Sequence, residues 1–150
     1  MIRAQCIVHR NAKLLMVRHR FEGEEWWCLP GGGVMPGEDA AIAALRELKE
    51  ECCVDGRLVR LLSHYTDDQD VESITYLVDI GEQLPQVGSD PEFIPQEQIL
   101  RELRWMALDE ICERDRAYLW AAGLLCVDEF LKELNSWGDE ISYPAPKSKV

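Results

Sequence analysis

Residues 31–54 read GGGVMPGEDAAIAALRELKEECCV, and the rest of the chain can be interpreted around this segment. Three consecutive glycines are unfavourable in a helix and costly in a strand, so they mark backbone that turns sharply or approaches another group closely. The segment after them predicts a helix from about residue 38 or 39 to residue 52, because its apolar residues recur at spacings of three and four. Those residues are Ile42, Leu45, Leu48 and Cys52. We expect this stripe to face the core.

Three carboxylates share one face of the predicted helix. Glu47 lies three residues before Glu50 and four before Glu51, and Arg46 lies four before Glu50. We expect this face to point away from the apolar stripe. Like charges at this spacing destabilise a helix, so the cluster predicts a compensating cation. Oxygen ligands suit Mg²⁺ or Mn²⁺ better than zinc, and such an ion beside a glycine loop is placed to bind phosphate oxygens and activate water.

The spacing of these acids from the glycines resembles the Nudix box of the Nudix hydrolase family, G-x5-E-x7-R-E-U-x-E-E-x-G-U, where U is a bulky aliphatic residue. The matching positions are Gly32, Glu38, Arg46, Glu47, Leu48, Glu50, Glu51 and Val54. The chain departs from the pattern at Cys53, where the family has a glycine that closes the helix with a positive φ. A cysteine that keeps this conformation costs about 1 kcal/mol, so we expect an effect on stability and geometry more than on chemistry.

The resemblance implies the Nudix fold, which is an α/β/α sandwich with a mixed β-sheet. By position, it implies that Glu47, Glu50 and Glu51 are metal ligands, together with a backbone carbonyl of Gly31 or Gly32. It also implies catalytic roles for Glu50 and Glu51. Arg46 would orient the carboxylates through a salt bridge, and Glu38 would support the loop.

The reaction implied by the resemblance is Mg²⁺-dependent hydrolysis of a nucleoside diphosphate linked to another group, with Mn²⁺ as an alternative ion. Water attacks a phosphorus in this reaction. The general base is left open between Glu50, Glu51 and a downstream acid. The downstream candidates are Asp90, Glu92 and Glu97. Nucleoside triphosphates, nucleotide sugars and ADP-ribose-like compounds all stay open as substrates.

Candidate substrate-binding residues lie outside the acidic helix. Arg18 and Arg20 close a predicted strand and are candidates for contact with a distal phosphate. Adjacent tryptophans on a strand point to opposite faces, so we expect at most one of Trp26 and Trp27 to face the ligand. The candidates for substrate binding are Arg18, Arg20, Trp26 and Gly32, with Phe21 and Tyr65 as further aromatic stacking surfaces.

The remaining sequence predicts alternating strands and one more helix. The expected strands cover residues 2–9, 14–20, 26–29, 58–65, 73–80 and 103–107, with a hairpin tip at 67–70. A second long helix is expected over residues 117–134, with a wide apolar face. We expect one domain over residues 1–135 and a loose tail over 136–150.

Composition narrows the function classes. The 150 residues carry a net charge of −12, while residues 1–20 hold five Lys and Arg and no acid. An acidic chain is a poor match for nucleic acid, so an anionic substrate needs a divalent cation or this N-terminal basic cluster. No membrane span or secretion signal is evident, so we expect a cytoplasmic protein with a small-molecule nucleotide substrate; a homodimer is left open. A regulatory nucleotide-binding module is the main alternative, and diphosphate isomerisation a weaker one.

Overall fold

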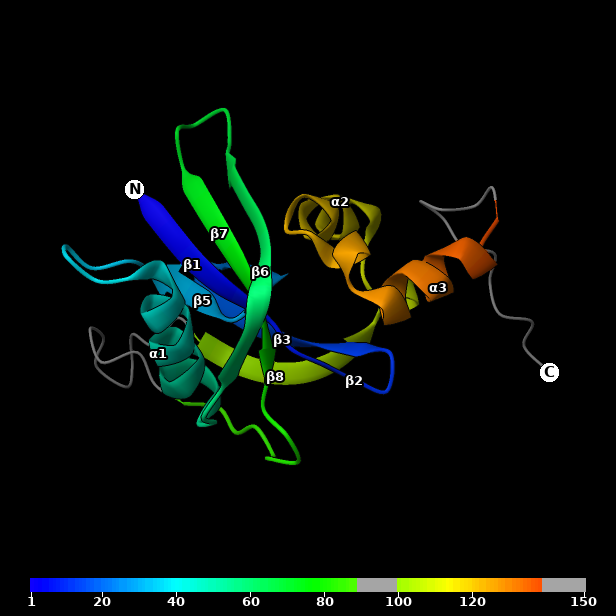
Figure 1. Cartoon of the computed structure of the whole chain (residues 1–150), viewed down its shortest axis with the longest axis horizontal. Coiled ribbons are helices and arrows are strands. Elements are labelled where there is room, and N and C mark those ends of the chain that lie inside the picture. The colour runs from blue at the N-terminus through cyan, green and yellow to red at the C-terminus, as the bar shows by residue number, and fades with distance from the viewer. Residues whose placement is uncertain (89–99, 139–150) are drawn as a thin grey trace.

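Two β-sheets form the centre of the computed structural model, which describes residues 1–88 and 100–138 (Figure 1). The first sheet has the order β5-β1-β7-β6. Its strands are β1 (Ile2–Ile7), β5 (Gly31–Gly33), β6 (Arg57–Thr66) and β7 (Glu72–Asp79). β1 runs parallel to β7 and antiparallel to β5, and β6 is antiparallel to β7, so this sheet is mixed as predicted.

The second sheet is antiparallel and is organised around one long strand. Its strands are β2 (His9–Arg10), β3 (Lys13–Phe21), β4 (Glu24–Cys28) and β8 (Leu100–Ala107). β3 pairs with each of the other three. Every predicted strand is therefore present, and the glycines of residues 31–33 add a short strand that was not predicted.

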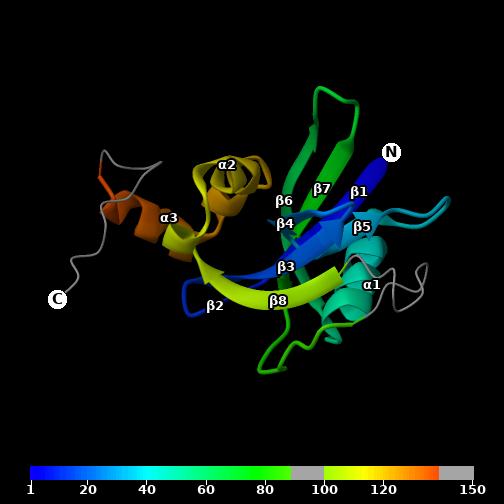
Figure 2. The same ribbon diagram turned by 180° about the vertical axis from the view of Figure 1, so that it is seen from behind.

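Helices lie on both sides of the sheets, as Figures 1 and 2 show from opposite directions. They are α1 (Ala40–Cys52), α2 (Glu113–Ala121), α3 (Asp128–Ser136) and the 3₁₀ turns η2 (Leu108–Glu110) and η3 (Leu124–Cys126). Strand alternation separates two buried clusters: Ala4 and Cys6 of β1 pack toward α1, while Ile7 packs with residues of α2 and α3. The expected α/β/α sandwich is confirmed. In the described ranges, no helix is long and apolar enough to cross a membrane.

Helix α1 ends at the predicted Cys52 and begins at Ala40, one residue after the later of the two predicted starts. Asp39 is its N-cap and accepts hydrogen bonds from the backbone N–H groups of Ala41 and Ile42. At the other end, Cys53 adopts the left-handed conformation, with φ 56° and ψ 35°, and its N–H donates to the Lys49 carbonyl. The glycine-type helix end is thus kept without glycine.

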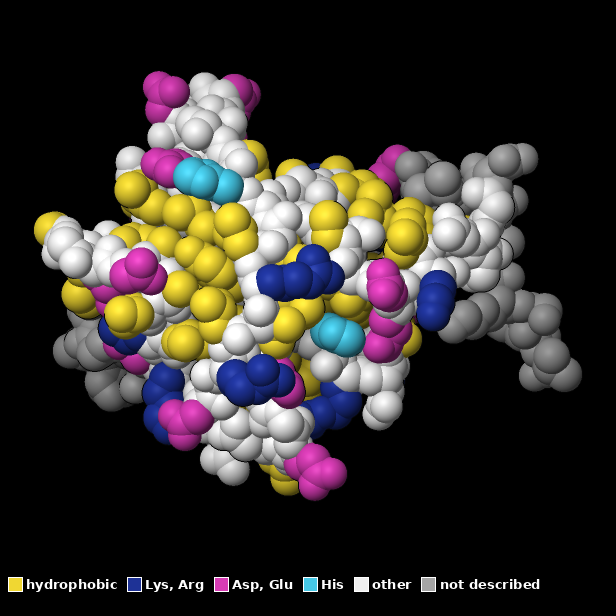
Figure 3. All heavy atoms as spheres, viewed as in Figure 1, with side chains coloured by type: hydrophobic (Ala, Val, Ile, Leu, Met, Phe, Trp, Pro, Cys, Tyr) yellow, Lys and Arg dark blue, Asp and Glu magenta, His cyan; other side chains and the backbone are white. Residues whose placement is uncertain are grey.

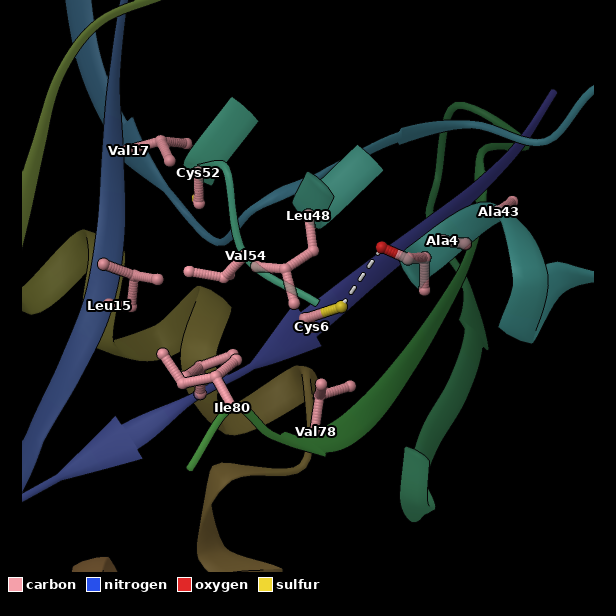
Figure 4. Packing of buried hydrophobic residues seen from close by; sticks show 12 residues of the cluster. Ala4, Cys6, Leu15, Val17, Ala43, Leu48, Cys52, Val54, Val78 and Ile80 are labelled. Atoms are coloured by element: carbon pink, nitrogen blue, oxygen red, sulfur yellow. Dashed lines mark hydrogen bonds between the residues drawn. The ribbon is translucent and has the colours of Figure 1, made fainter. Parts of the chain in front are cut away.

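The core face of α1 differs from the predicted stripe. Ala43, Ala44, Leu48 and Cys52 are buried, whereas Ile42 is 61% exposed. Small residues face inward because the helix lies close to β1: the Cys6 thiol donates to the Ala44 carbonyl at 3.4 Å (Figure 4). On the outside, hydrophobic side chains gather between α1 and the β6–β7 hairpin (Figure 3). Part of the apolar periodicity therefore belongs to the surface.

The helix predicted over residues 117–134 is wrong. The chain instead forms α2, η3 and α3, and the break is at Gly123. Gly123 has φ 90°, and a Cβ there would lie 2.8 Å from the Leu62 carbonyl oxygen of β6. Close contact with the sheet therefore interrupts a helical hydrophobic pattern that is continuous in the sequence. The predicted tail lies mostly outside the described residues.

Candidate active site

The glycine strand β5 brings the backbone against the acids of α1. The Gly31 N–H donates to Glu51 Oε1 at 2.7 Å. A Cβ on Gly31 would lie 2.5 Å from the Ala4 carbonyl oxygen, and one on Gly32 would lie 2.5 Å from the Glu47 carboxylate. The close approach predicted for these glycines is confirmed, and it occurs within a short strand paired with β1.

Arg46 is the hub that connects three carboxylates to this strand. Its guanidinium contacts Glu38 at 2.8 Å and 2.9 Å, Glu47 Oε1 at 2.9 Å and Glu50 Oε2 at 3.3 Å. It also donates to the Gly33 carbonyl at 3.1 Å. The hydrogen bond from Arg46 and one from the Met35 backbone lower the pKa of Glu38 to about 2. The salt bridges that the resemblance implies for Arg46 are therefore present.

Glu47 and Glu51 are the less exposed carboxylates of the α1 cluster. The Glu51 side chain is 8% exposed, and that of Glu50 is 29% exposed. The expectation that all three acids point away from the core is therefore wrong for Glu51, which turns inward to reach the Gly31 N–H. Burial raises the pKa of Glu47; the Arg46 hydrogen bond opposes this rise, and the charges of Glu51 and Glu50 add to it.

The chemistry of these donors fits a hard divalent cation. Three carboxylates lie near one another, and Arg46 is shared between Glu38, Glu47 and Glu50. Burial is the largest cause of the raised pKa of Glu47, and the neighbouring charges of Glu51 and Glu50 raise it further, so carboxylate charges gather at this point. Over residues 1–88 and 100–138, no three acids, histidines or cysteines already stand in a ligating geometry. A metal would therefore take these oxygens from their present contacts with Arg46 and Gly31.

His19 belongs to this site, although the sequence analysis did not select it. Its Nε2 lies 3.3 Å from Glu51 Oε2, and its ring stacks on Trp26 with centroids 5.8 Å apart. Burial lowers the pKa of His19, but its contacts with the Cys28 thiol and Glu51 outweigh burial and raise it to about 10. Strand alternation was the available signal, because His19 follows the inward-facing Val17 by two residues.

The two predicted arginines are held by acids. Arg18 pairs with Glu25 at 3.5 Å and with Glu102 at 3.2 Å, and the more exposed Arg20 approaches Glu25 at 3.8 Å. Neither arginine lines the cavity described next. Their predicted contact with a distal phosphate stays a prediction.

A cavity of about 550 Å³ opens between β4, the first sheet and α2. Its lining includes Arg3, Gln5, Trp26, Cys28, Tyr65 and Ser73. Gln5 is the register partner of Gly31, so the cavity begins one strand away from the glycine strand. Trp26 and Trp27 both line the cavity. Trp26 stacks on His19, while Trp27 packs against the cluster near α2, and the expectation that at most one of them faces the ligand stays a prediction.

The connector after β7 is anchored to the end of α1. The N–H groups of Gln86 and Gly88 donate to the carbonyls of Cys52 and Glu51 at 3.0 Å and 2.8 Å. These bonds satisfy carbonyls that a helix C-terminus otherwise leaves free. The downstream acids Asp90, Glu92 and Glu97 lie outside the described residues.

Comparison with known proteins gives one family. The NUDIX domain model matches residues 1–127. A CMP-5′-(N-acetyl-N-hydroxy-3-aminopropyl)phosphonate hydrolase of Streptomyces rubellomurinus is 36% identical over 69% of this chain and 49% of its own length. Bovine diphosphoinositol polyphosphate phosphohydrolase 3-beta is 38% identical over 50% of this chain and 47% of its own length. The chain thus spans about half the length of these curated relatives.

Solved structures agree on the fold. A NUDIX hydrolase from Nitrosomonas europaea superposes with a TM-score of 0.62 at 18% identity, covering 96% of this chain and 92% of the other. A C. elegans Ap4A hydrolase superposes with a TM-score of 0.63 at 18% identity, covering 87% and 98%. At such identities the likeness concerns the fold alone.

Proposed function

The chain belongs to the NUDIX domain family, and from that premise we propose that it hydrolyses the diphosphate linkage of a nucleoside diphosphate joined to another group. The observation that carries this proposal is the arrangement of Glu47, Glu50 and Glu51 around Arg46 and the glycine strand. Every acid of the family's motif is present on α1 or in the loop before it, beside the edge strand β5. A module that only binds nucleotides has no need for this complete set.

Glu47, Glu50 and Glu51 would hold Mg²⁺ or Mn²⁺, with a carbonyl of Gly31 or Gly32 as a further ligand. When bound, the ion would neutralise charge on the phosphate oxygens and lower the pKa of a bound water. Arg46 orients Glu47 and Glu50 through its fork of N–H groups, and Glu38 fixes the opposite edge of that fork. Gly31 fixes Glu51 through its N–H.

Glu50 is the more exposed of the two α1 candidates for general base, while Glu51 is held by Gly31 and His19. Arg46 contacts the two Glu50 oxygens at 3.5 Å and 3.3 Å, longer than the 2.7 Å bond from Gly31 to Glu51, so the more weakly held Glu50 is favoured as the group that takes a proton from water. Glu51 is better suited to ligation.

The cavity beside β4 supplies a place for the group carried by the diphosphate. Its volume of about 550 Å³ lies within the range of small-molecule sites, and Trp26 offers an aromatic face at 38% exposure. Ring stacking on an aromatic side chain tolerates different bases and sugars. Nucleoside triphosphates, ADP-ribose and nucleotide sugars are therefore the substrate classes to compare.

The test is product release from a panel of these compounds with and without Mg²⁺. We expect metal-dependent turnover of one class, and Glu51→Gln should lower it by about a hundredfold or more, as for loss of a transition-state contact. Glu82→Gln, a change at an exposed acid, is the matched control. Near-normal turnover in Glu51→Gln would exclude Glu51 as a ligand of the metal. Binding of nucleotides without turnover by the unmodified chain would favour the regulatory module.

A further inference from the structure

Two rows of residues cross the first sheet on the face toward α2. One row lies near the start of β1 and β7, and it runs Gly33, Arg3, Ser73 and Tyr65, each the register partner of the next. The other row runs Gly31, Gln5, Thr75 and Ser63. Arg3, Gln5, Ser73 and Tyr65 all line the cavity.

The side chains of the row through Gln5 are hydrogen-bonded to one another and to α2. The Gln5 amide donates to Thr75 Oγ1 at 2.9 Å and accepts a hydrogen bond from the Tyr118 hydroxyl of α2. The Ser63 hydroxyl donates to the Ala121 carbonyl at 2.6 Å. This row therefore has its partners within the protein and joins the sheet to α2.

The row through Arg3 has no such partners in the part of the chain that the structure describes. The Arg3 guanidinium makes no ion pair there, and the hydroxyls of Ser73 and Tyr65 make no hydrogen bond. Ser73 is only 7% exposed. All three residues line the cavity, so the Arg3 guanidinium and the two hydroxyls are available to a ligand there. We call Arg3, Ser73 and Tyr65 the donor row.

Most acids around the cavity already have ion-pair or hydrogen-bond partners, so they do not neutralise Arg3. Glu25 pairs with Arg18 and Arg20. Asp115 pairs with Arg114 at 3.2 Å. Asp67 accepts the N–H groups of its own turn at 2.8 Å and 2.9 Å. Glu24 is exposed at the end of β4. Arg3 is therefore a cavity-lining cation without an ion pair among the described residues, in a chain with a net charge of −12.

The donor row begins beside the acidic site. Arg3 is the register partner of Gly33, whose carbonyl accepts a hydrogen bond from Arg46. Neighbouring strands lie about 4.8 Å apart, so the Arg3 backbone is one strand from β5 and Ser73 is two. An anionic group seated on the row would therefore be close to, but distinct from, a phosphate held at Glu47 and Glu51.

We propose that the donor row of Arg3, Ser73 and Tyr65 binds a phosphate group that the substrate carries in addition to the scissile diphosphate. Guanidinium and hydroxyl donors match the oxygens of a phosphate. The preferred substrates are then compounds with more than two phosphates, rather than diphosphates linked to a neutral sugar. This inference rests on the proposed function and names its substrate class.

The first experiment measures binding without metal or turnover. Inorganic tripolyphosphate is titrated in EDTA by calorimetry into the full chain, Arg3→Gln and Arg57→Gln. Arg57 is an exposed arginine that pairs with Asp79 and does not line the cavity, so it is the matched control. We expect Arg3→Gln to weaken binding by about tenfold or more, Ser73→Ala to weaken it about threefold, and Arg57→Gln to leave it within about twofold. Arg3→Lys keeps the charge, so it should retain part of the affinity.

The second experiment compares hydrolysis of diadenosine tetraphosphate and diadenosine diphosphate, which differ only in the number of phosphates. The unmodified chain should have the lower KM for the tetraphosphate, and Arg3→Gln should raise that KM with little change in kcat. Equal tripolyphosphate binding by Arg3→Gln and the unmodified chain, or no binding by either, overturns the proposal that the donor row binds phosphate. Arg3-dependent binding without any turnover supports the row and counts against the proposed function alone.

Discussion

The two faces of the first sheet differ in how far their charged side chains are paired within the described residues. On the α1 face, Arg46 is bonded to three acids and the Gly33 carbonyl, and Glu51 is bonded to Gly31. On the α2 face, Arg3 has no ion-pair partner among the described residues. The acidic face is held together by contacts within the protein, whereas the donor row presents side chains to the cavity that have no partner among the described residues.

The largest effect on the α1 face is expected when Arg46, which pairs with three acids, is removed. Arg46→Ala should lower the free energy of unfolding by about 2–3 kcal/mol, because it leaves partly buried acids without their cation. Chemical denaturation measures this loss. Arg57→Ala is the control: its ion pair with Asp79 has side chains 71% and 49% exposed, and it should cost less than about 1 kcal/mol. Equal losses in the two variants would show that the Arg46 network does not organise this face.

A smaller change tests the fit between glycine and carboxylate. In Gly32→Ala the new methyl would lie 2.5 Å from the Glu47 carboxylate, so the flexible carboxylate must move. We expect turnover to fall by about tenfold while the fold is kept, since misplaced groups lose rate readily. Gly33→Ala has no atom within 4 Å of its new Cβ and keeps the carbonyl that Arg46 uses, so its turnover should not change. Unchanged turnover in Gly32→Ala would mean that the position of Glu47 is unimportant.

The Glu38–Arg46 pair gives a pH dependence of defined sign. The folded-state pKa of Glu38 is about 2, below its ordinary value of 4.5, so its stabilising effect is complete above pH 4.5 and is lost as pH falls toward 2. Glu38→Gln should therefore melt at a lower temperature than the unmodified chain at pH 7. The gap should close between pH 4.5 and 2. A gap that is constant with pH would exclude the charge of Glu38 as its cause.

The smallest expected effect is at the end of α1. Cys53 is exposed and holds a φ of 56°, which glycine adopts without steric cost. Cys53→Gly should leave the free energy of unfolding unchanged or raise it by up to about 1 kcal/mol. Thermal melts monitored by circular dichroism measure it. A clear loss of stability would show that the cysteine side chain makes a contact worth more than the strain.

The acidic site could be predicted from sequence because most of it is local. Arg46, Glu47, Glu50 and Glu51 lie within two turns of one helix, and helical spacing alone places them together. The wrong prediction of a single helix over residues 117–134 has a non-local cause, since Gly123 takes its conformation against Leu62 of another element. Local periodicity contains no information on that contact.

Pairing between distant strands explains what the sequence analysis missed. Arg3 and Ser73 become neighbours only because β1 runs parallel to β7, seventy positions later in the chain. His19 reaches Glu51 only because β3 and α1 share a core. Charge in the first twenty residues indicated that cations were available, but only the sheet register shows that Arg3 faces a cavity.

Mn²⁺ titration followed by electron paramagnetic resonance tests whether the acidic face is a metal site that is separate from the donor row. We expect Mn²⁺ to bind the unmodified chain, and to bind at least about tenfold more weakly to Glu47→Gln and to Glu51→Gln, because each change removes a carboxylate ligand. We expect unchanged Mn²⁺ affinity in Arg3→Gln. Undiminished binding in both glutamate variants would contradict the assignment of the acidic face as the metal site.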